Sequence, residues 1–120
     1  ERMRGGELFV PKIPSIRIVD LAEAMAPGMP TRIVGIRPGE KLHEVMCPQD
    51  DSHLTIEFGD HYVIQPTIKF WGRDDRPYDT NALGETGRRV AQDFEYNSGT
   101  NPHFFSVDEI RVFNRLAAVE

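Results

Sequence analysis

Prolines and glycines break the first 50 residues into short segments, and this constrains the fold more than any other feature of the sequence. A proline fixes its own φ and disfavours a helical conformation in the residue before it. Residues 11–15, which contain two prolines, must therefore be extended, and residues 27–30 must end any helix that precedes them. Pro48 must end any element that follows the Pro38-Gly39 turn. Only short helices and strands can form in this part of the chain.

Between these breaks, the spacing of apolar residues predicts two helices. Apolar side chains recur at helical spacing from Ile18 to Met25, which predicts a helix over residues 16–26 with Ser15 as its N-cap. The sequence Ser-Val-Asp-Glu at residues 106–109 is a capping box, and an apolar stripe follows it to the last residues. We therefore expect the second helix to begin at this capping box.

Other segments have the composition of short strands. The Gly59-Asp60 step between two of them indicates a hairpin, and residues 41–46 are expected to form one or two helical turns. Residues 66–95 are rich in Asp and Arg, which fits a solvated excursion or an element that packs on another chain. The whole is predicted to be a small α+β fold in one domain. The expected strands are residues 7–10, 31–36, 54–58 and 61–65.

Composition excludes several classes of function. The 120 residues carry a net charge of -5, which argues against a general nucleic-acid binder. The single cysteine, Cys47, excludes an internal disulfide and a cysteine-based zinc site, and is interpreted as a partly buried structural thiol. The four histidines do not fall at metal-ligand spacings. No apolar run approaches the roughly 18 residues of a membrane span, so we expect no membrane partner and a reducing, cytoplasmic setting.

The most unusual candidate site is the turn that carries Arg37 and Glu40. A turn made rigid by Pro38 and permitted by Gly39 would hold the Arg37 guanidinium at the rim of a pocket, where its forked donors suit a phosphate or carboxylate. Glu40 could accept hydrogen bonds from vicinal hydroxyls, such as those of a ribose. Spacing alone favours the alternative that Arg37 and Glu40 pair with each other or with Glu44.

Two further candidates are weaker. Lys12, between two prolines, could present a point positive charge to a diphosphate, although a solvated surface lysine is the simpler interpretation. Residues 96–101 are dense in hydrogen-bonding side chains, including Asn97, and could line a sugar pocket or contact another subunit, although an ordinary turn is favoured. The chain has neither a Tyr-x-x-x-Lys motif nor a Gly-x-Gly-x-x-Gly motif. It therefore lacks both parts of a hydride-transfer machinery.

Taken together, these segments resemble a known family. Gly-Gly-Glu-Leu-Phe-Val-Pro-Lys-Ile-Pro-Ser at residues 5–15, Ile-Arg-Pro-Gly-Glu-Lys-Leu-His-Glu at residues 36–44 and Phe-Glu-Tyr-Asn-Ser-Gly-Thr-Asn at residues 94–101 resemble the C-terminal region of the inverting UDP-N-acetylglucosamine 4,6-dehydratases. These enzymes begin pseudaminic acid synthesis and belong to the extended short-chain dehydrogenase/reductase superfamily. The Arg-Pro-Gly-Glu-Lys-Leu string also occurs in retaining dehydratases, and residues 10–15 favour the inverting group.

The resemblance implies that residues 1–120 form a C-terminal substrate-binding region of the polysaccharide biosynthesis protein type. In the family, a Rossmann lobe binds NADP and carries the catalytic groups, so this chain alone should bind no cofactor and should be inactive. The implied partners are UDP-N-acetylglucosamine, the missing Rossmann lobe, which would dock on exposed apolar surface, and further copies in a homo-oligomer.

The resemblance also implies roles for single residues. By position, Arg37 would contact the diphosphate, Glu40 the uridine ribose and Lys12 the phosphate or uracil, while Asn97 would approach the sugar. The alternatives left open are a retaining 4,6-dehydratase, a 4-epimerase and a non-enzymatic assembly module.

Overall fold

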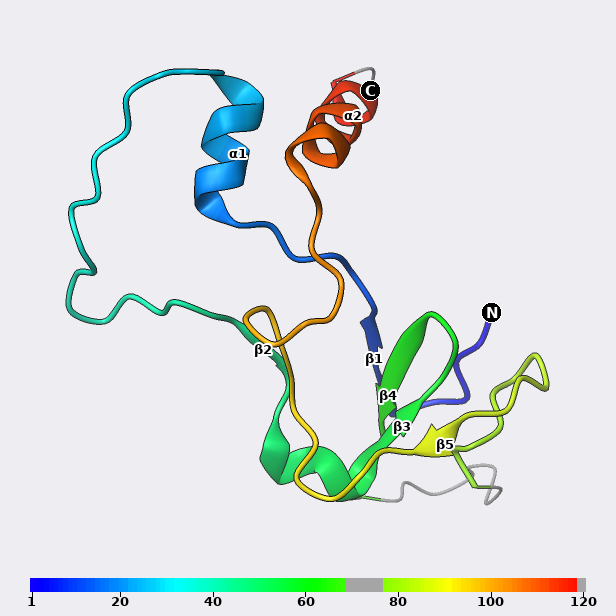
Figure 1. Ribbon diagram of the computed structural model, residues 1–120. Coiled ribbons are helices and arrows are strands. Elements are labelled where there is room, and N and C mark those ends of the chain that lie inside the picture. Colours follow the sequence, from blue (N-terminus) through cyan, green and yellow to red (C-terminus); the bar gives the residue numbers. More distant parts are fainter. Residues whose placement is uncertain (69–76, 119–120) are drawn as a thin grey trace. The chain divides into compact units, whose positions relative to one another are not determined.

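The computed structural model describes residues 1–68 and 77–118, and the chain divides into two compact units (Figure 1). The first, which we call the sheet unit, comprises Glu1–Lys12 and Val45–Asn97. The second, which we call the helical unit, comprises Ile13–Glu44 and Ser98–Glu120. Each unit is therefore built from two stretches that are distant in sequence.

The sheet unit is organised by a four-stranded antiparallel sheet with the strand order β1-β4-β3-β5. In its register, Phe9 and Ile56 both lie opposite Val63, and Val10 and Glu57 both lie opposite Tyr62. Because side chains alternate between the two faces of a strand, this register sorts the residues into two sets. The strands are β1 (Leu8–Pro11), β3 (Thr55–Glu57), β4 (His61–Ile64) and β5 (Arg88–Arg89).

Each face of this sheet has its own apolar cluster. Ile56, Phe58 and Val63 are buried on one face. On the other, Val10 and Tyr62 pack with residues of a second, two-stranded sheet, in which β2 (Val45–Cys47) pairs with β6 (Tyr96–Asn97). The aromatic ring of Tyr62 lies 5.2 Å from that of Phe94 and 5.1 Å from that of Tyr96. Both faces of the sheet therefore carry buried apolar residues.

The predicted hairpin at Gly59-Asp60 is confirmed. The Phe58 N–H donates to the His61 carbonyl at 2.9 Å, and β3 and β4 pair antiparallel on either side of the turn. A short 3₁₀ helix, η1 (Gln49–Leu54), connects β2 to β3. Pro48 precedes it in an extended conformation, as expected for a proline that ends one element before the next begins.

The helical unit contains α1 (Ile18–Met25) and α2 (Val107–Ala117), which pack against each other. The predicted capping box is confirmed: the Glu109 N–H donates to Ser106 Oγ at 3.3 Å, and the Ser106 N–H donates to Glu109 Oε2 at 2.7 Å. Ile110, on the next turn, is fully buried. This cap fixes where α2 begins and therefore which of its faces carries the buried residue.

Many apolar side chains of the helical unit are nevertheless more than half exposed. The docking of a Rossmann lobe on these side chains stays a prediction. They are Ile13, Ile18, Val19, Met25, Met29, Ile33, Val34, Ile36, Leu42, Val112, Phe113 and Leu116.

Three local predictions are wrong. Ser15 is not the cap of α1; the helix begins at Ile18 after Arg17, without a side-chain cap, because the Ser15 backbone is paired with His103 and Phe105 instead. Residues 31–36 form no strand, since no strand of the described chain lies beside them to accept their backbone hydrogen bonds. Residues 41–46 form no helical turns, because Val45–Cys47 joins β6 as a strand.

The predicted α+β class is confirmed. Every pairing between strands of the described chain is antiparallel, and no parallel sheet is present in residues 1–68 and 77–118. Of the weakly patterned residues 66–95, the described part contributes β5, while residues 69–76 lie outside the described residues.

Gly87 provides a test of the packing beside β3. An added Cβ would lie 2.7 Å from Ile56 Cγ2 and 2.9 Å from Phe58 Cε2, both in the buried cluster. We expect Gly87→Ala to lower the free energy of unfolding in urea by about 1–3 kcal/mol, as overpacking does. Gly59→Ala is the control, because nothing lies within 4 Å of its added Cβ. Equal effects of the two substitutions would contradict this account of the packing.

Candidate functional site

The Arg37–Glu40 turn has the geometry expected from its sequence. The Glu40 N–H donates to the Arg37 carbonyl at 3.1 Å, and Gly39 has a φ of 84°, as the third residue of a type II turn requires. The Glu40 carboxylate accepts from the Arg37 N–H at 2.9 Å and lies 3.8 Å from Arg37 Nε. The two residues do pair, yet the Arg37 side chain remains 84% exposed. Its guanidinium therefore presents donors to solvent from a defined turn.

The polypeptide beyond this turn is held by the segment that follows β6. The Glu44 N–H donates to Ser98 Oγ at 2.9 Å, and the Ser98 N–H donates to the Glu44 carbonyl at 2.9 Å. The ring of His43 lies against Gly99, since a Cβ added there would meet three ring atoms at 2.7 Å. Two of the three segments that carry the family resemblance are thus in direct contact.

Asn101 joins the third segment to them. Its side chain is buried, and its Nδ2 donates to the Ile13 carbonyl at 2.8 Å and to Ser15 Oγ at 3.0 Å. Its Oδ1 accepts from the His103 N–H at 3.1 Å. The candidate segment 96–101 includes Asn101, but sequence reasoning chose Asn97 as its site residue. Asn97 lies on β6, where its Nδ2 donates to Glu95 Oε1 at 2.7 Å.

Lys12 is not a fully solvated surface lysine. Its Nζ donates to Glu57 Oε1 at 2.8 Å and lies 5.0 Å from the centroid of the Tyr62 ring, and both charged side chains are about 30% exposed. Arg88 Nη2 lies 3.6 Å from the other carboxylate oxygen. The hydrogen bond from Lys12 is the main cause that lowers the pKa of Glu57, and the charges of Lys12 and Arg88 add to it.

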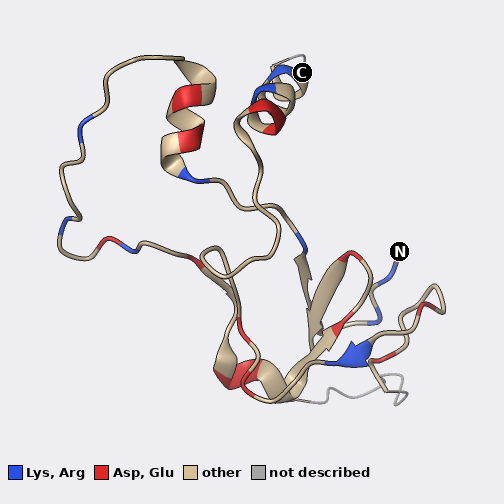
Figure 2. Cartoon of the chain, in the orientation of Figure 1, with Lys and Arg blue, Asp and Glu red and all other residues tan. Residues whose placement is uncertain are grey.

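This cluster of Lys12, Glu57 and Arg88 borders an open pocket of about 460 Å³. Strand β5, which consists of two arginines, appears as a wholly blue arrow in Figure 2. Sequence reasoning missed Glu57 and Arg88. The alternation along residues 54–58 does place Glu57 on the polar face of its strand. Its partners, Lys12 and Arg88, are distant in sequence, and no local pattern connects them to Glu57.

The four predicted site residues therefore fall into two groups. Arg37 and Glu40 belong to the helical unit and contact each other, while Lys12 and Asn97 belong to the sheet unit. Within the sheet unit, Lys12 and Asn97 are engaged by different carboxylates, Glu57 and Glu95. Their roles toward a substrate stay predictions.

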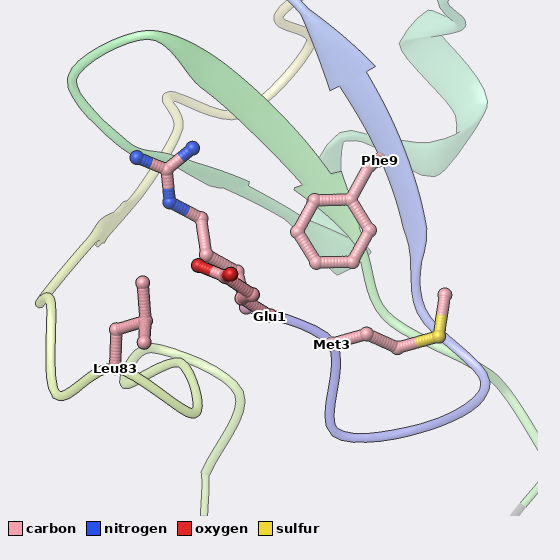
Figure 3. A pocket seen from close by; sticks show the side chains of 5 residues that line it. Glu1, Met3, Phe9 and Leu83 are labelled. Atoms are coloured by element: carbon pink, nitrogen blue, oxygen red, sulfur yellow. The ribbon is translucent and has the colours of Figure 1, made fainter.

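A second pocket of the sheet unit has a volume of about 530 Å³, and Figure 3 shows the side chains that line it. Arg2 contacts Glu85 at 2.7 Å and Asp60 at 3.4 Å, and Asp60 contacts His61 Nδ1 at 2.6 Å. The hydrogen bond with His61 and the charge of Arg2 lower the pKa of Asp60. Two carboxylates therefore share the Arg2 cation. The pocket is lined by Glu1, Arg2, Met3, Phe9 and Leu83.

The described residues do not provide a metal or dinucleotide site. Within residues 1–68 and 77–118, no group of three or more His, Cys, Asp or Glu side chains is placed to hold a metal ion. No helix of this part of the chain is long and apolar enough to span a membrane. NADP binds at the carboxyl ends of parallel strands, whereas the strand pairs described are antiparallel. The described residues do not fit this cofactor.

By fold, the described residues form a small α+β chain with antiparallel sheets, without the parallel sheet of a nucleotide-binding Rossmann domain. The chain belongs to the polysaccharide biosynthesis protein family, whose model matches residues 1–66.

Individual relatives agree with this assignment. The chain is 54% and 51% identical, in each case over 110 residues, to the proteins named UDP-N-acetylglucosamine 4,6-dehydratase (inverting) from two strains of Campylobacter jejuni. Each match covers 92% of this chain and 33% of the relative, so the chain spans about a third of the length of these relatives. The X-ray structure of Pen from Bacillus thuringiensis matches 97% of this chain and 33% of its own, with a TM-score of 0.68 and 25% identity. The chain is therefore homologous to one part of a dehydratase.

The ion pair between Lys12 and Glu57 predicts a pH-dependent coupling. In a double-mutant cycle with Lys12→Met and Glu57→Gln, we expect a coupling free energy of about 1 kcal/mol at pH 7, the upper end for pairs that keep solvent contact. The pKa of Glu57 is lowered in the folded chain. The coupling should therefore be complete above the unfolded pKa of about 4.3 and should be lost as the pH falls through the lower, folded value.

Urea unfolding of the four proteins between neutral and acidic pH measures this coupling, and the other carboxylates cancel in the cycle. The matched control is a cycle between Arg88 and Glu57, since Arg88 is 84% exposed and should couple by less than about 0.5 kcal/mol. A coupling that does not change with pH would refute the assignment to this ion pair.

Cys47 should be unreactive in the folded chain. Its side chain is fully buried, and burial, with a smaller contribution from Asp51, raises the pKa of the thiol from 9.0 to about 11. A shift of two pH units leaves about 100-fold less thiolate at any pH below both values. At pH 8 we expect an aromatic disulfide reagent to label the native chain at least that much more slowly than the urea-unfolded chain. Equal rates would contradict the buried position of Cys47.

Proposed function

We propose that this chain is the UDP-sugar-binding part of an inverting UDP-N-acetylglucosamine 4,6-dehydratase. The observation that supports it most strongly is the 54% identity to a protein of that name, in a match that covers 92% of the chain and therefore includes Arg37. An exposed arginine held on a defined turn is the kind of group that a diphosphate-binding site needs.

In this proposal, Arg37 binds the diphosphate and Glu40 accepts hydrogen bonds from the ribose hydroxyls. The contact that the guanidinium makes with Glu40, at 3.8 Å and in solvent, contributes at most about 1 kcal/mol. A charge-assisted hydrogen bond to phosphate contributes about 1.5–3 kcal/mol, and a guanidinium can make two. The phosphate therefore competes successfully for Arg37, and Glu40 is released toward the ribose.

Lys12 would act through its charge rather than through a free ammonium group. Its cluster contains two cations, Lys12 and Arg88, around the single carboxylate of Glu57, so one positive charge is unbalanced. Such a surplus attracts a phosphate or the uracil carbonyls while Glu57 keeps the lysine in place. Asn97 would face the sugar, and to donate to it would have to exchange its bond with Glu95.

In this proposal, the residues that catalyse the reaction lie in the part of the enzyme that this chain does not cover. In the enzyme we propose, C4 of the sugar is oxidised, water is lost across C5 and C6, and hydride returns to C6 with inversion at C5. NADP and the Tyr-x-x-x-Lys pair belong to the remaining two-thirds of such an enzyme, acting in the cytoplasm at the start of pseudaminic acid synthesis. The contribution of this chain is to bind and orient the UDP group.

Substitution of Arg37 tests the proposal. We expect UDP to shift the backbone amide resonances of residues 37–44 in an NMR titration, and Arg37→Ala to weaken UDP binding about tenfold or more, since at least one charge-assisted hydrogen bond is lost. Arg37→Lys should recover only part of the affinity, because lysine keeps the charge without the fork.

Arg32→Ala is the matched control, because Arg32 is an exposed arginine of the same segment, five positions earlier. If this control weakened UDP binding as much as Arg37→Ala, the effect would be one of net charge, and the assigned role of Arg37 would be wrong. Amides of residues 37–44 that do not respond to UDP would overturn the proposal itself.

A further inference from the structure

We propose that Ser98 and Gly99 form a latch that positions the Arg37–Glu40 turn for nucleotide binding. The inference rests on the proposed function and assigns a positioning role to two residues that do not themselves contact the nucleotide.

The turn needs such a device because of where it lies. Every residue from 27 to 45 is exposed, and the described chain contains no helix or strand between α1 and β2. At the N-terminal end, the Gly28 N–H donates to Glu23 Oε2 at 3.2 Å, beyond the end of α1. Packing around Arg37 therefore does little to hold it. A binding group on a loose segment loses affinity because its backbone must be ordered when the ligand binds.

Ser98 and Gly99 are distant from the turn in sequence but contact the chain just after it, at His43 and Glu44. Glu44 and Ser98 exchange two hydrogen bonds of 2.9 Å, one of them made by the Ser98 hydroxyl. Beside them, the His43 ring occupies the space that a side chain at residue 99 would fill, with three ring atoms 2.7 Å from an added Cβ. Only glycine permits this approach. The contact therefore fixes His43 as well as the backbone of Glu44.

The latch is itself anchored. Two residues after Gly99, the buried side chain of Asn101 makes hydrogen bonds to Ile13, Ser15 and His103. These bonds restrain the backbone of residues 98–101 within the helical unit. The turn is closed by its own hydrogen bond at Glu40 and the latch by those at Glu44. Only residues 41–43 lie between these two restraints.

This arrangement makes a specific prediction about coupling. If the latch acts by holding the Arg37–Glu40 turn in its binding conformation, loosening the latch should weaken UDP binding more when Arg37 is present than when it is absent, because Glu40 alone then uses that conformation. A substitution that merely damages the fold would weaken binding to the same degree with or without Arg37.

The test is a double-mutant cycle between Gly99→Ala and Arg37→Ala in the 120-residue chain, with the dissociation constant of UDP as the readout. We expect about a tenfold loss from Arg37→Ala, about a three- to tenfold loss from Gly99→Ala, and a combined loss clearly smaller than the product of the two. Additive losses would overturn the latch. No loss from Arg37→Ala would instead overturn the proposed function.

A second measurement tests the latch without any ligand. In Gly99→Ala the amide hydrogen of Glu44 should exchange with solvent faster than in the parent chain, whereas Gly59→Ala, with nothing within 4 Å of its added Cβ, should leave that rate unchanged. Unchanged exchange in Gly99→Ala would overturn the latch even if the proposed function holds.

Should Gly99→Ala fail to fold, Ser98 supplies the same test with a smaller change. Ser98→Ala removes the hydroxyl that accepts from Glu44, and Ser98→Thr restores a hydroxyl at that position. We expect Ser98→Ala to speed the exchange of the Glu44 amide and weaken UDP binding about threefold, and Ser98→Thr to recover both. Equal behaviour of the two variants would contradict the latch.

Discussion

The buried amide of Asn101 is the interaction on which the helical unit depends. Its donor and acceptor atoms are both used, by Ile13 and Ser15 on one side and by His103 on the other. A buried amide left without partners costs about 1–3 kcal/mol, so the two segments are held at the spacing this side chain spans. The two helices start a few residues beyond these segments, and the segment that holds Glu44 starts a few residues before Asn101. Asn101 thus links the segments that precede the two helices to the segment that contacts Glu44.

In the sheet unit the comparable constraint is the register of β4 with its two neighbours. The register that opposes Tyr62 to Val10 and Glu57 also directs Lys12, two residues after Val10, over the ring of Tyr62 and onto Glu57. A slip of one residue would exchange the two faces of the strand and separate Lys12 from Glu57. The apolar clusters on both faces oppose such a slip. The charge cluster is therefore a consequence of core packing, which explains how a lysine and a glutamate 45 positions apart meet.

Sequence patterns predicted the structural features that depend on contacts between residues close together in the chain. The capping box of α2 and the Gly59-Asp60 hairpin were predictable because their hydrogen bonds join residues within a few positions of one another. The failures concern Ser15 and residues 31–36 and 41–46, where the outcome depends on a distant partner. Ser15 is drawn away from α1 by His103 and Phe105, and Val45–Cys47 becomes a strand only because Tyr96–Asn97 is available to pair with it. For the same reason, Arg37 could be singled out from its turn, whereas Glu57 and Arg88 could not.

The energies of the Arg37 turn explain why its surroundings matter more than its own contacts. Its pair with Glu40 contributes at most about 1 kcal/mol, which is comparable with the roughly 1–2 kcal/mol needed to fix the backbone of a single residue. That pair alone therefore cannot hold the segment in one conformation. The turn bond at Glu40 and the two bonds at Glu44 together restrain the residues that follow Arg37 before any ligand arrives. The energy that a diphosphate gains from the guanidinium is then available for binding, because little of it is needed to order the chain.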